Sequence, residues 1–234
     1  MKITYWSDYA CPYCYIGEVR LKKAIESIPE LNNVQLEMKA FQLDPSAGEH
    51  AVSDTQTRFA DKYGISFEAA GRQIETISQM GMGEELDFRY GSTLFTNTMD
   101  AHRLTKLAQS KGDPALSERV ISALFKAYFT DNKELADKAL LQKIGETCGL
   151  DATEVREVLN SDTYRDEVIS DEKEAFQKGI HAVPYFVIGK YAIPGAQSVE
   201  GMKATLQKAL AQETESNEGQ GMAFSCGPDG CKIG

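Results

Sequence analysis

Apolar side chains recur with two different periods along the chain, and the changes of period mark out its organisation. Residues 2–6 are β-branched and aromatic, which predicts a short buried strand. A helical pattern follows between Pro12 and Pro29, with its apolar positions mostly on one face: Ile16, Val19, Ala24, Ile25 and Ile28. Residues 34–41 then alternate apolar and polar side chains, as a second strand does. A helix between two strands predicts a β–α–β unit with parallel strands.

The middle of the chain has a helical pattern throughout. Predicted helices cover residues 54–63, 67–80, 98–110, 117–129, 137–148, 151–160 and 162–178. Strands return at 185–188 and 191–193, and the two-residue turn Gly189-Lys190 between them is typical of a hairpin. A last helix is predicted over residues 198–212. The order β–α–β, long helical insert, β–β–α indicates an α/β fold.

Composition narrows the range of partners. The chain has 234 residues and a formal net charge of −10. Nucleic acids and anionic membrane surfaces need a basic face on their partner, so this charge argues against both. No apolar run approaches the roughly 20 residues of a membrane-spanning helix. The N-terminus shows no apolar signal-peptide segment, so we expect a cytoplasmic protein, where five cysteines do not predict a structural disulfide framework.

The strongest chemical signal is the sequence Cys11-Pro12-Tyr13-Cys14 at the start of the first helix. Thiol–disulfide exchange needs a nucleophilic thiolate and a second thiol close enough to resolve the mixed disulfide. The N–H groups and dipole of a helix N-terminus favour a thiolate at Cys11, which we therefore predict to be the nucleophile, with Cys14 as the resolving thiol. Pro12 restricts the loop. The neutral Tyr13 adds no positive charge, so we expect a redox potential less oxidising than that of a strong periplasmic oxidant.

The same cysteine spacing also suits half of a zinc site, which Cys226 and Cys231 could complete. Four-sulfur sites more often combine two C-x-x-C pairs, whereas this chain combines C-x-x-C with C-x₄-C. The first pair also opens a helix after a strand, which is the setting of a thioredoxin-like redox motif. We therefore predict redox chemistry and no metal.

Val183-Pro184 precedes the third predicted strand. Such a proline can be trans and simply begin the strand. Together with the β–α–β unit, the C-x-x-C pair and the later hairpin, however, it completes the pattern of a thioredoxin fold. In that fold the equivalent proline is cis and faces the dithiol.

Further motifs accompany the dithiol: residues 8–14 (DYACPYC), 41–45 (FQLDP), 97–104 (NTMDAHRL), 124–129 (LFKAYF) and 194–197 (PGAQ). With these motifs the chain resembles the DsbA family of thiol–disulfide oxidoreductases, and within it the cytoplasmic FrnE-like branch. The resemblance covers about residues 1–210. Several motifs in order are far more specific than C-x-x-C alone.

The resemblance implies a thioredoxin-like domain built from residues 1–44 and 162–212. An inserted α-helical domain of residues 45–161 interrupts it, and a flexible tail of residues 213–234 follows. It also implies a cis Val183–Pro184 bond and pairing of the Val183 backbone with a polypeptide substrate beside Cys11. The expected activity is that of a protein disulfide oxidoreductase/isomerase with polypeptide thiols or disulfides as partners. No cofactor is expected, although glutathione could act as reductant.

Two other functions stay open. The 2-hydroxychromene-2-carboxylate isomerases and kappa-class glutathione transferases share the superfamily and use glutathione. They typically have a serine at the position of Cys11 and lack the second cysteine, so the intact dithiol counts against this alternative. The other alternative is a redox-regulated chaperone whose thiols only switch its state.

Three further features have open roles. Cys148 lies in an apolar helix and is predicted to be a buried, inert thiol. His102 is expected to pack or cap a helix. Asp8 precedes Cys11 by three residues, and either modulates its thiol or caps the turn.

Cys226 and Cys231 match the extra C-terminal pair of some FrnE-like proteins. The intervening Gly-Pro-Asp-Gly forms turns readily, which would let the two thiols approach within disulfide range. They are either two free thiols or a second redox pair. In the second case they exchange with Cys11 and Cys14 across the segment 213–225, which as a flexible coil spans about 20 Å.

The hypothesis of a second redox pair in the tail can be tested with one double variant. The double variant Cys226→Ser/Cys231→Ser is expected to turn over more slowly than the wild type, because the relay is lost. Its oxidised form is expected to show an altered disulfide map by mass spectrometry. Unchanged turnover together with an unchanged map would rule out the relay.

Overall fold

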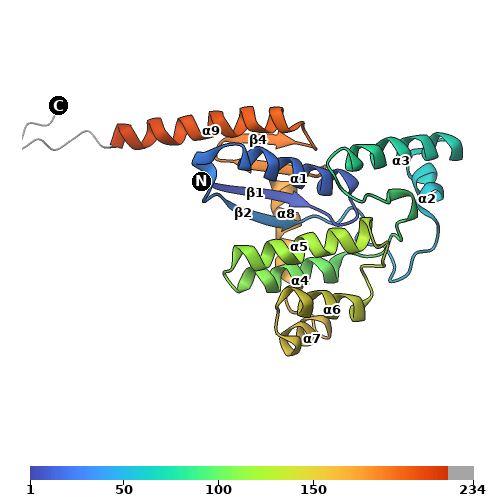
Figure 1. The fold of residues 1–234 in the computed structure, drawn as a ribbon. Helices are drawn as coiled ribbons and strands as arrows, with labels where there is room; N and C mark the ends of the chain where they lie inside the picture. Colours follow the sequence, from blue (N-terminus) through green and yellow to red (C-terminus); the bar gives the residue numbers. More distant parts are fainter. Residues whose placement is uncertain (221–234) are drawn as a thin grey trace, which may run out of the picture.

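A four-stranded sheet of order β2-β1-β3-β4 forms the centre of the molecule (Figure 1). The computed structural model describes the backbone of residues 1–220 and the side chains of residues 1–213. β1 (Lys2–Ser7) pairs in parallel with β2 (Gln35–Ala40) and antiparallel with β3 (Tyr185–Ile188). β3 pairs antiparallel with β4 (Tyr191–Pro194). The parallel unit and the hairpin predicted from the sequence are therefore confirmed.

Alternate residues of β1 face opposite sides of the sheet, and both sides are covered. Tyr5 points into the main core and stacks on Phe186 with ring centroids 5.5 Å apart. That side carries α1 (Pro12–Glu26) and α9 (Val199–Gln220), which pack against each other. Trp6 points the other way, into a separate cluster with Phe41 and Ala175. Every strand thus buries apolar surface, as a sheet between helices requires.

The helical insert contains α2 (Thr55–Tyr63), α3 (Phe67–Met82), α4 (Met99–Ser110), α5 (Pro114–Phe129), α6 (Lys138–Cys148) and α7 (Ala152–Leu159). α8 (Arg165–Gln177) then returns to the sheet and packs on β2. Single 3₁₀ turns lie at Pro29–Leu31 and Tyr90–Ser92. In Figure 1, α2 and α3 lie at one end of the molecule, while α4 to α7 lie below the sheet. None of the helices within residues 1–220 is long and apolar enough to cross a membrane.

Side-chain caps explain most of the helix starts. Aspartate or serine side chains accept backbone N–H groups at the first turns of α2, α3, α5, α6 and α7: Asp54, Ser66, Asp113, Asp137 and Asp151. α5 begins three residues earlier than predicted. Asp113 caps it and Pro114 fits its first position, where a missing N–H costs nothing.

The last helix differs most from the prediction. α9 continues to Gln220, so the expectation of a flexible segment is wrong for residues 213–220. Extending a packed helix costs little per residue, and the three glutamates of this segment are good helix formers. Glu213 Oε2 lies 3.9 Å from the N-terminal nitrogen of Met1, at the end of β1 away from Ser7. The span of about 20 Å estimated for segment 213–225 assumed a flexible coil, and this assumption does not hold for residues 213–220. Cys226 and Cys231 lie outside the described residues.

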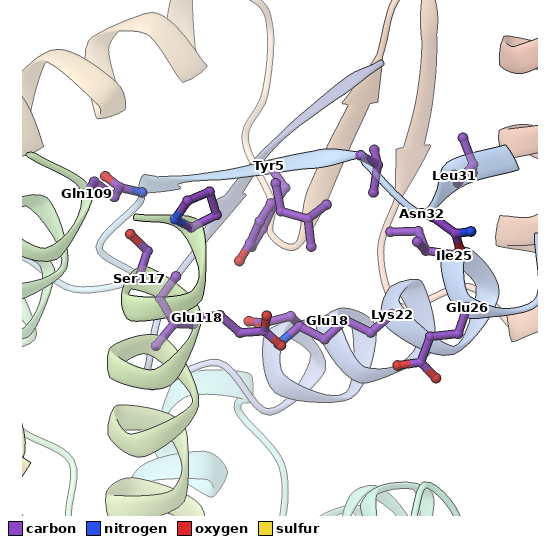
Figure 2. A pocket seen from close by; sticks show the side chains of 14 residues that line it. Tyr5, Glu18, Lys22, Ile25, Glu26, Leu31, Asn32, Gln109, Ser117 and Glu118 are labelled. Carbon is purple, nitrogen blue, oxygen red and sulfur yellow. The ribbon is translucent and has the colours of Figure 1, made fainter. Parts of the chain in front are cut away.

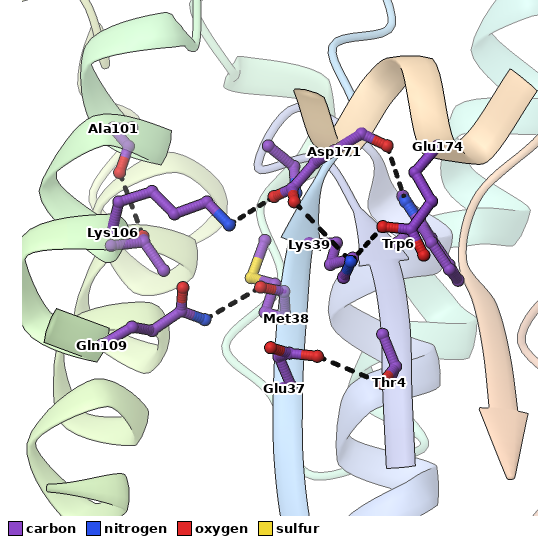
Figure 3. Close-up of polar contacts among 12 residues, drawn as sticks. Thr4, Trp6, Glu37, Met38, Lys39, Ala101, Lys106, Gln109, Asp171 and Glu174 are labelled. Carbon is purple, nitrogen blue, oxygen red and sulfur yellow. Dashed lines mark hydrogen bonds and ion pairs between the residues drawn. The ribbon is translucent and has the colours of Figure 1, made fainter. Parts of the chain in front are cut away.

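Asp171 on α8 ties the second side of the sheet to the insert (Figure 3). Its Oδ2 accepts the N–H of Ala40 at the end of β2 (2.9 Å) and forms an ion pair with Lys106 on α4. Its backbone carbonyl accepts the indole N–H of Trp6 (2.9 Å). Lys39 lies 4.0 Å from the other carboxylate oxygen. One buried side chain thus joins β2, α4 and α8.

This arrangement predicts a large loss of stability in Asp171→Ala. The substitution removes the buried carboxylate that accepts the Ala40 N–H, and it leaves Lys106, which is only 15% exposed, without its counter-charge. We expect the free energy of unfolding in urea to fall by about 3 kcal/mol. Asp131→Ala, which breaks an exposed ion pair with Lys126, is the matched control and should cost less than about 1 kcal/mol. Equal losses in the two variants would contradict this role of Asp171.

Candidate active site

Cys11 lies at the junction between β1 and α1. It is the N-cap of α1, with φ −92° and ψ 114°, and Pro12 is the first helical residue. The Cys11 N–H donates to the carbonyl of Asp8 (3.1 Å), and the Cys11 carbonyl accepts the N–H of Cys14 (3.1 Å). The Cys11 side chain makes no capping hydrogen bond. Its sulfur stands at the positive end of a 15-residue helix.

Cys14 lies one turn into α1 and is buried more completely than Cys11. Cys14 is 1% exposed and Cys11 is 4% exposed, and both are free thiols. Burial raises the pKa of the Cys14 thiol well above its usual value, and the neighbouring Cys11 raises it further. The Ser7 hydroxyl and the N–H of Asp8 oppose this rise, and that N–H lies 3.4 Å from the Cys14 sulfur. Cys14 therefore stays protonated in the reduced protein.

Val183 and Pro184 meet the dithiol from the other side. Their peptide bond is cis, which confirms the expectation drawn from the sequence. The Cys11 thiol donates to the carbonyl of Val183, with sulfur and oxygen 3.6 Å apart. Gly17 permits this approach, because a Cβ on Gly17 would lie only 3.0 Å from Cγ of Pro184. The third strand is thus held directly against the first turns of α1.

A cleft of about 370 Å³ opens beside Cys11, between the start of α1, the loop before β3 and the helical insert. Its walls carry many aromatic rings: Tyr13, Phe59, Tyr63, Tyr90, Phe95 and Tyr128. Arg58 and Lys62, both on α2, also line it, whereas its described walls contain no aspartate or glutamate. The Arg58 guanidinium lies 3.1 Å from the ring centre of Phe95, which fixes its position. The cleft therefore combines the Cys11 thiol with positive charge, in a protein that is acidic overall.

Arg58 and Lys62 were not identified from the sequence. They lie in a polar helix with no motif, and only the packing of α2 against α3 and the turn at Tyr90–Ser92 brings them to the cleft. Tyr13, in contrast, was singled out and lies where expected, 41% exposed at the rim. His181 lines the same cleft from the loop before Val183.

His102 has a more specific position than packing or capping. Its Nε2 lies 3.2 Å from Oδ1 of Asp8, and both side chains are buried. Oδ2 of Asp8 accepts the N–H of Leu43 (2.8 Å). Asp8 and His102 therefore join the loop before the dithiol to α4 of the insert. The sequence signal for this contact was the DYACPYC and NTMDAHRL motifs, although neither motif alone indicates the pairing.

Asn97 in the second of these motifs holds a neighbouring loop. Its side-chain N–H donates to the carbonyl of Pro45 (3.1 Å), and its Oδ1 accepts the N–H of Met99 (2.8 Å). The Asn97 N–H donates to the carbonyl of Gly48 (2.9 Å). The FQLDP segment and the start of α4 are thus joined close to the dithiol.

A second cavity, of about 290 Å³, lies between α1, β2 and α5 (Figure 2). Three of the charged side chains that line it pair with one another: Lys22 lies 2.7 Å from Glu18 and 3.1 Å from Glu118. Although burial lowers the pKa of Lys22, these two carboxylates raise it above its usual value. No cysteine lines this cavity in the structure as described. The cleft beside Cys11 is therefore the candidate active site.

Two other predictions concern metals and Cys148. Within residues 1–220 no group of three or more His, Cys, Asp or Glu side chains could hold a metal ion. Cys148 is not buried as predicted but partly exposed at the end of α6, where its thiol donates to the carbonyl of Arg119 (3.6 Å). The C-terminal turn of α6 lies closer to the surface than its apolar pattern indicates.

Comparison with known proteins shows which family has this architecture. The family model described as the DSBA-like thioredoxin domain matches residues 2–207. The crystal structure of a probable DsbA oxidoreductase from Streptomyces coelicolor is 33% identical, with a TM-score of 0.84 over 100% of this chain and 99% of that one.

More distant structures share the fold. A 2-hydroxychromene-2-carboxylate isomerase has a TM-score of 0.67 at 13% identity, covering 95% of this chain and all of its own. The cytosolic disulfide reductase DsbM from Pseudomonas aeruginosa, solved with GSH, has a TM-score of 0.60 at 12% identity, covering 93% of this chain and all of its own. Identities this low support only the shared fold. From the match over residues 2–207, the chain belongs to the DsbA-like family of thiol–disulfide oxidoreductases and has its thioredoxin-like fold with a helical insert.

Proposed function

We propose that this protein is a cytoplasmic protein thiol–disulfide oxidoreductase/isomerase of the FrnE-like branch, with Cys11 as nucleophile and Cys14 as resolving thiol. The observation that carries the proposal is the position of the Cys11 sulfur. It stands at the start of α1, 3.6 Å from the Val183 carbonyl, and lines an open cleft. The buried Cys14 lies one turn away on the same helix.

In the reducing direction, the Cys11 thiolate attacks one sulfur of a substrate disulfide. A mixed disulfide forms and the first substrate thiol leaves. Cys14 then attacks the Cys11 sulfur, the Cys11–Cys14 disulfide forms, and the second substrate thiol is released. In the oxidising direction, a substrate thiolate attacks the Cys11–Cys14 disulfide at Cys11, and a second substrate thiol releases the reduced enzyme. Isomerisation follows when a different substrate thiol resolves the mixed disulfide.

The edge formed by Val183 and Pro184 supports binding of an extended polypeptide. An extended segment pairs with a backbone edge by main-chain hydrogen bonds, largely independent of its sequence. Val183 is partly exposed beside Cys11, and the aromatic rim at Tyr13 and Tyr63 is 41% and 57% exposed. A docked segment therefore brings its cysteine to the Cys11 sulfur with apolar contacts on either side.

The dithiol mechanism predicts distinct outcomes for the two cysteines. Cys11→Ser is expected to reduce insulin at the uncatalysed rate, because the attacking thiolate is lost. Cys14→Ser is expected to accumulate mixed disulfides with substrate, visible by non-reducing electrophoresis, because Cys11 still attacks but nothing resolves the product. Cys148→Ser, which changes a thiol outside the cleft, is the control and should match the wild type.

Other results of these activity assays would support one of the alternative functions. Insulin reduction or ribonuclease refolding that survives Cys11→Ser would rule out the dithiol mechanism. Suppression of aggregation without turnover would support a redox-regulated chaperone instead. Glutathione-dependent isomerisation of a small aromatic substrate would support the isomerase alternative.

Glutathione is a second proposed partner, as the reductant that returns the dithiol to its active form. The charge of the cleft favours this role, because Arg58 and Lys62 provide two cations beside Cys11 and glutathione carries two carboxylates. DsbM, which shares the fold, was solved with GSH. The same charges favour thiols with a nearby carboxylate over neutral or cationic thiols.

This charge preference is testable with two small thiols. Arg58→Gln and Lys62→Gln are each expected to lower the rate constant for reduction of the oxidised enzyme by glutathione about tenfold, because a charge-assisted contact is lost. The rate constant with cysteamine, which has no carboxylate, should change less than about twofold. Lys190→Gln, on the hairpin between β3 and β4, is the matched control. Equal losses with both thiols would contradict a carboxylate-binding role.

A further inference from the structure

Asp8 uses all of its polar atoms at the junction between the dithiol and the insert. Its N–H lies 3.4 Å from the Cys14 sulfur, and its carbonyl accepts the Cys11 N–H (3.1 Å). Its carboxylate accepts the N–H of Leu43 (2.8 Å) at one oxygen and lies 3.2 Å from Nε2 of His102 at the other. The Asp8 side chain is fully buried. Both cysteines of the dithiol are therefore hydrogen-bonded to one residue.

The position of Asp8 depends on its two carboxylate partners. A buried carboxylate is tolerated only where donors satisfy it, so Leu43 and His102 hold it in place. His102 is itself fixed, because it is 1% exposed and its ring centre lies 5.0 Å from that of Tyr9. The Tyr9 hydroxyl in turn hydrogen-bonds Thr105 on α4. The insert thus sets where the Asp8 carboxylate lies, and with it where the Asp8 N–H points.

Cys14 needs such a donor more than Cys11 does. To resolve a mixed disulfide, the Cys14 thiol must lose its proton to water and attack the Cys11 sulfur. The Cys11–Cys14 bond then forms while the bond from Cys11 to the substrate sulfur breaks, and the leaving thiolate takes up a proton. Two electrons pass from the dithiol to the substrate disulfide. Burial opposes the negative charge that develops on Cys14, and a fixed N–H donor offsets part of that cost.

We propose that Asp8 and His102 are positioning residues for the resolving step: their contact holds the Asp8 N–H against the Cys14 sulfur. The proposal rests on the dithiol exchange proposed above. It assigns the helical insert a part in the chemistry, because His102 reaches Asp8 from α4. The first attack by Cys11 does not depend on this hydrogen bond.

The two steps can be separated with 5,5′-dithiobis(2-nitrobenzoate) under single-turnover conditions. In a Cys148→Ser/Cys226→Ser/Cys231→Ser background, which leaves only Cys11 and Cys14 to react, attack by Cys11 releases the first coloured thiol and resolution by Cys14 releases the second. His102→Phe keeps a ring but removes the donor to Asp8. We expect it to slow the second release about tenfold, the order expected for one hydrogen bond to a charged group, and to change the first less than twofold.

Two matched variants distinguish positioning from a general structural role. His102→Gln retains a side-chain N–H and is expected to restore the second release to within about threefold of the wild type. His50→Phe is the control, because His50 also pairs with a carboxylate, Glu134 at 3.0 Å, but is 84% exposed and outside the dithiol junction. It should leave both releases unchanged. Should His102→Phe fail to fold, the double variant Asp8→Asn/His102→Phe leaves no buried charge unpaired, and it should show the same slow second release.

The proposal is overturned if a folded variant lacking the His102 donor releases the second thiol within twofold of the wild-type rate, or if both releases slow equally. It is also overturned if His102→Gln is as slow as His102→Phe. Failure of the dithiol mechanism looks different. In that case Cys11→Ser would keep the first release, or Cys14→Ser would keep the second.

Discussion

The active-site junction depends on a buried carboxylate, that of Asp8. A charge can be removed from water only where donors replace its hydration, and here the donors come from two distant parts of the chain. The N–H of Leu43 lies beyond the end of β2, and His102 lies on α4 of the insert. The Asp8 carboxylate needs both hydrogen-bond donors, and this requirement fixes the β–α–β unit, the insert and the dithiol relative to one another.

Asp171 acts as a second anchor with a different consequence. It joins α8, β2 and α4 through Ala40 and Lys106, but it does not contact either cysteine of the dithiol. Asp8 also binds the backbone of Cys11 and the sulfur of Cys14. Both carboxylates hold the helical insert in place, and in Asp8 the backbone of the same residue is hydrogen-bonded to both cysteines.

Charge is distributed unevenly in this protein. The chain carries a formal net charge of −10, yet the cleft beside Cys11 presents Arg58 and Lys62 with no acidic residue in its described walls. An acidic surface around a cationic cleft directs anionic groups toward the thiol and away from the rest of the surface. The aromatic rings that line the same cleft add apolar surface beside these cations.

Features that depend on the local order of residues could be predicted before the structure was known. Strand and helix positions follow from apolar periodicity, α1 begins where Pro12 fits a first turn, and Val183-Pro184 precedes its strand as the motif indicates. The tertiary structure alone decided which distant side chains meet. Arg58 and Lys62 reach the cleft only because α2 folds over it, and His102 reaches Asp8 only because α4 packs behind the dithiol. Periodicity specifies which face of a helix is buried, whereas the partner of a buried polar group depends on where separate elements come together in space.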